Sequence, residues 1–106
     1  MVTYEEFKKL DIRVAKVISA EDHPNADRLY VLKIDTGVDT RTIVAGIKNF
    51  YKKEELLDKN IVVITNLEPA MIRGVESNGM LLAASDDNGI CVLMPDRNPA
   101  VGSKVS

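Results

Sequence analysis

The chain has 106 residues, a length that suits one domain over residues 1–106. Its 14 Lys and Arg against 16 Asp and Glu give a net charge of −2, which excludes bulk attraction to nucleic acid or an anionic membrane. One cysteine and one histidine exclude a disulfide framework and argue against a metal site, so no cofactor is expected. The chain shows no signal peptide and no apolar stretch of membrane-spanning length, which predicts a soluble cytoplasmic protein without a membrane partner.

The N-terminal half of the sequence predicts a short helix followed by three strands. Thr3 to Glu6 fit a capping box, which favours a brief helix at the N-terminus. Alternating apolar residues then predict strands over 11–19, 29–35 and 41–47. The polar, proline-containing segment 21–27 is expected to form the loop between the first two strands.

The C-terminal half predicts one more helix and three more strands. Good helix formers over 50–58 favour a short helix. Segment 66–78 is expected to be a long irregular loop, and Asp86 to Gly89 should form a turn. The strands are expected at 61–65, 80–85 and 90–94.

This element order is that of the OB-fold, a five-stranded Greek-key barrel. We therefore predict an all-β protein with an OB-fold barrel, short helices and an extra C-terminal strand region. The strand at 90–94 exceeds the five strands of such a barrel and is apolar on both faces. Because large apolar patches are rarely left exposed, a second copy of the chain is its simplest cover, which predicts a homodimer. The alternative is that this strand packs on the barrel of its own chain.

Two enzymatic functions, an aspartic protease and a cysteine–histidine enzyme, are not favoured by the sequence. Asp35-Thr36-Gly37 has the signature of an aspartic protease, in which each copy of a dimer donates one carboxylate. Lys33 interrupts the apolar lead-in and no Gly-rich flap follows, so a turn between strands is the preferred interpretation. Cys91 is expected to be a small buried hydrophobe, and His23 lies in a polar loop, so they predict no nucleophile and base pair. No catalytic residue is expected.

The charge distribution instead favours binding. Residues 28–59 contain seven basic side chains against five acidic ones, although an ordinary solvated surface could carry the same charges. Aromatic residues make up 5% of the chain, which argues against base stacking and favours a folded RNA read through phosphates and shape. The candidate phosphate contacts in this segment are Lys33, Arg41, Lys48, Lys52 and Lys53.

Several sequence blocks taken together resemble one known family. They are residues 11–17 (DIRVAKV), 23–30 (HPNADRLY), 44–47 (VAGI), 66–69 (NLEP), 73–84 (RGVESNGMLLAA) and 93–96 (LMPD). These blocks resemble the tRNA-binding domain found at the C-terminus, or as a separate subunit, of methionyl-tRNA synthetases. The same domain occurs in free-standing dimeric tRNA-binding proteins and in the endothelial monocyte-activating polypeptide. The resemblance runs from about residue 7 to residue 105.

The resemblance implies an OB-fold that grips tRNA by its L-shape without reading the anticodon. It also implies a methionyl-tRNA synthetase catalytic subunit as partner, assisted in cis or in trans. In the family a Ser-x-Gly-Met segment is tied to tRNA binding, which carries over to Ser77, Gly79 and Met80. Asn66 and Arg73 match positions in the same loop region, and the Arg73 guanidinium suits a phosphate.

One departure from the family pattern bears on affinity. Many members carry Lys or Arg between the NLxP and RG blocks, where this chain has Ala70, Met71 and Ile72. This predicts weaker tRNA binding, or binding mainly through the cations of residues 33–53. A related bacterial chaperone uses the same barrel as a dimer to bind unfolded polypeptides, so peptide binding is the alternative function within the fold.

Overall fold

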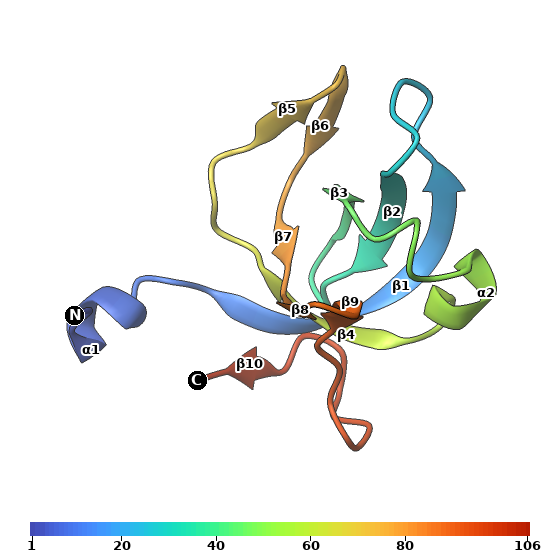
Figure 1. The fold of residues 1–106 in the computed structure, drawn as a ribbon. Helices are drawn as coiled ribbons and strands as arrows, with labels where there is room; N and C mark the ends of the chain where they lie inside the picture. The colour runs from blue at the N-terminus through green and yellow to red at the C-terminus, as the bar shows by residue number, and fades with distance from the viewer.

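The computed structural model describes all 106 residues, beginning with the predicted N-terminal helix. The helix α1 spans Tyr4–Phe7 and no residue in it is buried. Its capping box is confirmed, because the Glu6 N–H donates to Thr3 Oγ1 at 3.2 Å and the Thr3 N–H donates to Glu6 Oε1 at 3.3 Å. The helix stands away from the rest of the molecule (Figure 1). Local capping, rather than packing, therefore holds α1 together.

A curled antiparallel sheet forms the body of the protein (Figure 1). Its longest strand, β1, pairs with β4 on one edge and with both β2 and β10 on the other. The register shifts between Val17 and Ser19, as at a β-bulge, which lets a long strand bend around a barrel. This confirms the predicted all-β, OB-like architecture. The strands of the sheet are β1 (Ile12–Asp22), β2 (Tyr30–Asp35), β3 (Thr40–Ala45), β4 (Asn60–Ile64), β7 (Met80–Leu81) and β10 (Lys104–Val105).

The alternating apolar residues meet inside this curl and form the core. Leu32, Ile34 and Ile43 are fully buried, whereas Lys33 between the first two is exposed. Burial of each large aliphatic side chain contributes about 1.5–3 kcal/mol to folding. The alternation predicted for residues 29–35 therefore corresponds to an inner and an outer face of β2.

The predicted helix at 50–58 is too long, because α2 spans only Lys53–Leu56. The helix stops where the backbone of the next residues pairs with β1: the Asp58 N–H donates to Val17 O at 3.0 Å, and the Val17 N–H donates to Lys59 O at 2.9 Å. Asp58 has a φ of 62°, which ends the helical geometry. Strand pairing thus overrides local helix propensity.

The predicted irregular loop at 66–78 is wrong, since it contains a hairpin of β5 (Ala70–Ile72) and β6 (Val75–Ser77). Its two-residue turn is Arg73-Gly74, with φ angles of 53° and 91°, the left-handed pair that tight hairpins require. The common sequence signals for this turn are Asn-Gly and Asp-Gly, so Arg-Gly does not by itself predict a hairpin.

The predicted strand at 80–85 is two strands. β7 pairs with β4, whereas β8 (Ala83–Asp86) pairs with β9 (Gly89–Val92) across the predicted turn. Val92 is buried against the barrel of its own chain, while Leu93 and Met94 are exposed. Cys91 is also exposed, which corrects the expectation of a buried thiol. No helix is long and apolar enough to cross a membrane.

Candidate nucleic-acid interface

The outer face of β2 and β3, flanked by two loops, is the face on which OB-folds bind oligonucleotides. Here the flanking segments are the β1–β2 loop (residues 23–29) and the β4–β7 loop (residues 65–79), which carries the β5–β6 hairpin. Both rise on the same side of the barrel, at the top of Figure 1. Lys33 is exposed at the centre of this face, paired in register with Ser19 of β1 and Thr42 of β3. The face is thus polar and carries a central cation.

The two loops are hydrogen-bonded to each other at their tips. His23 Nε2 lies 2.9 Å from the carbonyl oxygen of Ile72, at the end of β5. Beside it, Asn25 Nδ2 donates to Arg73 O at 3.1 Å and Arg73 Nη2 donates to Asn25 O at 3.3 Å. Arg73 and Arg28 are both exposed, so this junction places one arginine on each loop next to the face.

Arg41 lies on the opposite side of the sheet from Lys33, because it shares the parity of buried Ile43. Its Nη1 donates to Thr65 O at 2.5 Å, and its Nε is 3.1 Å from Asp39 Oδ1. The Thr36 hydroxyl, reinforced by Arg41, holds the pKa of Asp39 below its usual value. Arg41 is therefore engaged within the chain, in contrast to the expectation that it faces the ligand.

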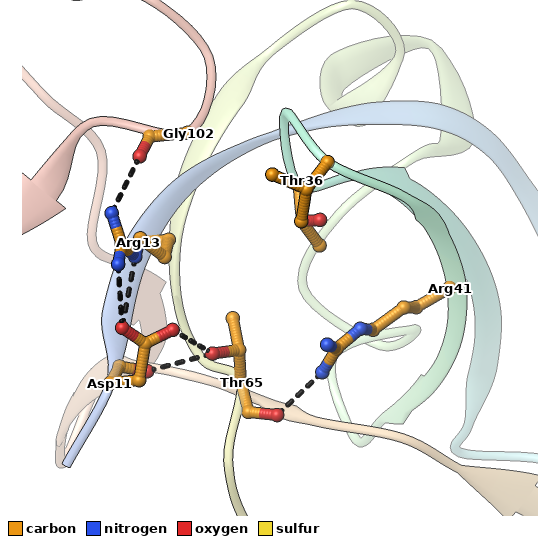
Figure 2. A pocket seen from close by; sticks show the side chains of 7 residues that line it. Asp11, Arg13, Thr36, Arg41, Thr65 and Gly102 are labelled. Carbon is orange, nitrogen blue, oxygen red and sulfur yellow. Dashed lines mark hydrogen bonds and ion pairs between the residues drawn. The ribbon is translucent and has the colours of Figure 1, made fainter. Parts of the chain in front are cut away.

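Figure 2 shows the polar cleft at this end of the barrel, where Asp11 and Arg41 bond Thr65 from two sides and Arg13 lies beside Asp11. Arg13 forms an ion pair with Asp11 at 2.9 Å and donates to Gly102 O at 3.2 Å. The Arg13 guanidinium, and then the Thr65 hydroxyl, hold the pKa of Asp11 below its ordinary value of 3.8. Arg13 and Arg41 thus each have a carboxylate partner and a backbone carbonyl partner within the chain. The cleft therefore offers no free cation to a ligand.

The lysines of the predicted basic segment are divided between paired and free positions. Lys48 and Lys53 both lie 3.3 Å from Asp22 Oδ1, and their hydrogen bonds, that of Lys48 first, hold the pKa of this carboxyl below its usual value. Lys52 is exposed at the start of α2, where its backbone N–H donates to Glu55 Oε1 at 2.8 Å. Of the five predicted cations, only Lys33 and Lys52 form no ion pair in the structure.

Ser77 does not present its hydroxyl at the surface, which corrects its expected role as a phosphate or ribose contact. The residue is buried, its Oγ accepts from the Val44 N–H at 2.9 Å, and its hydroxyl donates to Gly79 O at 3.1 Å. Gly79 has a φ of 150°, and a Cβ there would approach Ile64 O to 3.2 Å. Of the predicted Ser-x-Gly-Met contacts, only the Met80 side chain is substantially exposed, at 47%.

Asn66 also has a local structural task. Its Oδ1 accepts from the Asp11 N–H at 2.8 Å, and its Nδ2 donates to Lys9 O at 2.7 Å. Both ends of the amide are therefore engaged with the segment that connects α1 to β1. Asn66 therefore links this segment by two hydrogen bonds to the end of β4.

The carboxylate of Asp35 caps the turn that follows β2. Its Oδ1 accepts from the Gly37 N–H at 2.8 Å, as the turn interpretation predicts. The Gly37 backbone packs against Gly102 so closely that a Cβ would lie 2.8 Å from the Gly102 Cα. Residues 35–37 thus form a packed turn, and Asp35 has a structural role.

Sequence reasoning missed the residues that bring the two loops together. Arg28 is one of the seven basic side chains of residues 28–59 but not a predicted contact, and the sequence predicts only a polar loop at His23 and Asn25. Arg28 and Arg73 stand in blocks that carry the family resemblance, at 23–30 and 73–84. Membership in these blocks is the one signal in the sequence, because nothing in residues 31–72 indicates that the two blocks meet.

Comparison with known proteins agrees with this geometry. The family model described as "Putative tRNA binding domain" matches residues 12–104. The chain belongs to this tRNA-binding domain family. It is 55% identical over 104 residues to the methionine–tRNA ligase of Pyrococcus horikoshii, covering 98% of this chain but only 14% of that ligase. The family resemblance predicted from the sequence blocks is confirmed.

Two solved structures share the whole fold of this family member. A protein from Pyrococcus horikoshii described as MetRS related superposes with a TM-score of 0.93 at 34% identity, covering 100% of this chain and 98% of that one. The CsaA chaperone protein of Picrophilus torridus gives a TM-score of 0.93 at 35% identity, with both chains fully covered. One backbone arrangement therefore occurs in proteins described by two different functions.

Proposed function

We propose that this chain is a non-catalytic domain that binds tRNA by shape and backbone charge and assists a methionyl-tRNA synthetase in cis or in trans. The observation that carries the proposal is the family match over residues 12–104 combined with free cations at the OB ligand face. No ion pair of the structure involves Arg28, Lys33 or Arg73, and all three are exposed. They are thus available to phosphates, with Lys52 and Met80 as further contacts.

The composition of the face supports a folded RNA over a single strand. Single strands are held largely by stacking of bases on exposed aromatic side chains. Tyr30, the one aromatic residue on β2 or β3, is buried and donates its hydroxyl to Tyr51 O at 2.7 Å. The outward positions of these strands carry aliphatic, hydroxyl and charged side chains instead. Recognition through phosphates, 2′-hydroxyls and shape suits such a surface.

A homodimer and a cytoplasmic location belong to the same proposal. The helix α1 has no buried residue, and it exposes Tyr4 and Phe7, while Leu93 and Met94 are exposed beyond β9. A second copy of the chain would cover these apolar side chains. Residues 1–106 would then act as one domain in each copy.

Measurement of tRNA retention on filters across a salt series tests tRNA binding. Affinity should fall with salt, with a slope in log–log form of about −0.7 to −0.9 per phosphate contact. Lys33→Ala should reduce this slope by about one contact. The matched control is Lys59→Ala, which removes an exposed, unpaired cation next to β4. Absent or salt-independent retention, or equal effects of the two variants, would count against the proposal.

Chaperone activity is the second candidate, favoured by the likeness to CsaA and by one apolar groove. The groove has a volume of about 350 Å³ and runs between the end of β3 and the β7–β9 region. Its apolar lining includes Val44, Ile47, Met80, Leu81 and Ile90. Suppression of aggregation of an unfolded client, undiminished by added tRNA, would favour this function over tRNA binding.

A further inference from the structure

The one buried residue of the β1–β2 loop is His23, which is 5% exposed although it stands in a polar segment. The Asn25 N–H lies 2.9 Å from His23 Nδ1, and His23 Nε2 lies 2.9 Å from Ile72 O. A backbone N–H can only donate, so Nδ1 must accept. The ring proton therefore resides on Nε2 and is donated to Ile72 O. A single imidazole thus joins the β1–β2 loop to the residue just before the hairpin turn.

The other bonds between these loops are exposed to solvent. The Asn25 side chain bonds Arg73 O, and the Arg73 guanidinium bonds Asn25 O at the longer distance of 3.3 Å. Water competes with exposed hydrogen bonds of this kind, whereas a buried donor left without its acceptor is costly. The His23 bond to Ile72 is therefore the link that fixes the separation of the two loop tips.

We propose that His23 is a positioning residue: it holds the two loops together so that Arg28 and Arg73 meet the tRNA already ordered. This inference rests on the proposed function. His23 itself does not touch the RNA, because its ring is buried and both ring nitrogens are engaged. Ordering the loops before binding removes an entropic cost that the complex would otherwise bear.

Two conservative variants separate the two hydrogen bonds of the ring. In His23→Gln the side-chain amide reaches the position of Nε2 and keeps a donor for Ile72 O. In His23→Asn the shorter side chain keeps an acceptor near Nδ1 for the Asn25 N–H and loses the bond between loops. We expect His23→Asn to weaken tRNA binding about threefold to tenfold, the equivalent of one hydrogen bond, and His23→Gln to stay close to the parent protein.

The salt dependence distinguishes positioning from direct contact. Neither His23 variant removes a phosphate contact, so both should keep the slope of log affinity against log salt, whereas Arg73→Ala should reduce it. A reduced slope in His23→Asn would make His23 a contact residue and overturn the proposal. Equal losses in His23→Asn and His23→Gln would also overturn it, because the bond between loops would then be irrelevant.

Hydrogen exchange in the free protein separates this inference from the function on which it rests. His23→Asn should speed amide exchange across β5 and β6, and His23→Gln should not. Equal protection in all three proteins would overturn the inference even where tRNA binds. If tRNA does not bind but the exchange pattern holds, the proposed function fails and the loop junction stands. Should His23→Asn not fold, a nitrogen-15 spectrum of the parent ring decides, since a proton on Nδ1 would refute the geometry.

Discussion

Replacement of Ser77 by alanine tests whether this residue holds the structure or touches the ligand. The Val44 N–H points from the open edge of β3 to Ser77 Oγ at 2.9 Å, and the hydroxyl continues to Gly79 O at 3.1 Å. Ser77 thereby supplies the partner that a neighbouring strand would otherwise provide. Ser77→Ala leaves the Val44 donor and the Gly79 acceptor without this partner.

The magnitude follows from the burial of Ser77, which is 4% exposed. A buried polar group that loses its partner costs about 1–3 kcal/mol of folding free energy. We therefore expect Ser77→Ala to lower the free energy of unfolding by about 2 kcal/mol. For a domain near this size, that loss corresponds to a decrease in Tm of about 10 °C.

Urea-induced and thermal unfolding measure this loss, with Ser85→Ala as the matched control. Ser85 lies on β8, is exposed and makes no side-chain hydrogen bond in the structure, so its replacement should change stability by less than about 0.5 kcal/mol. The urea m-value should be the same in all three proteins. A loss in Ser77→Ala no greater than in Ser85→Ala would refute the reasoning. A reduced salt slope of tRNA binding by folded Ser77→Ala would restore Ser77 as a direct contact.

Three further substitutions test the remaining structural assignments. Asp11→Asn should lower the free energy of unfolding by about 0.5–1 kcal/mol at pH 7, because Arg13 stabilises the Asp11 carboxylate. Since the pKa of Asp11 is lowered in the folded state, the difference in urea unfolding between variant and parent should diminish as pH falls below 3.8 and then disappear. Gly79→Ala should cost more than about 1 kcal/mol by thermal unfolding, because of its φ of 150° and the closeness of Ile64 O and two buried side chains. Gly46→Ala has more room, with a nearest contact of 3.6 Å, and should be tolerated. Arg41→Lys should lower the Tm through loss of its guanidinium bonds, and filter retention of tRNA should keep the parent affinity and salt slope.

Each of these expectations has an opposing result. A difference between Asp11→Asn and the parent protein that does not diminish as the pH falls below 3.8 would show that the carboxylate charge is not its source. Equal stabilities of the Gly79→Ala and Gly46→Ala proteins would show that the backbone at residue 79 adapts freely. A reduced salt slope in Arg41→Lys would place Arg41 at the RNA after all.

The sequence by itself determined the local order of this protein. Alternation at residues 29–35 placed Leu32 and Ile34 on one face of a strand and Lys33 on the other, because successive side chains of a strand point to opposite faces, and the structure buries the first of these faces. The capping box at Thr3 and the turn before Gly89 were equally readable, since each depends on residues only two or three positions apart. The family also followed from sequence, because its blocks extend along nearly the whole chain.

Only the tertiary structure decided which of the predicted residues can serve the binding face. Arg41 and Ser77 are engaged by backbone groups 24 and 33 residues away, and His23 bonds a carbonyl 49 residues away. Such partners are chosen by how the barrel closes, and periodicity within a segment carries no information about them. The backbone bonds of Asp58 and Lys59 with Val17 of β1 likewise end α2 at Leu56, although the residues that follow were predicted to be helical. Hydrogen bonds between distant strands therefore settled both the extent of the elements and the orientation of the candidate site.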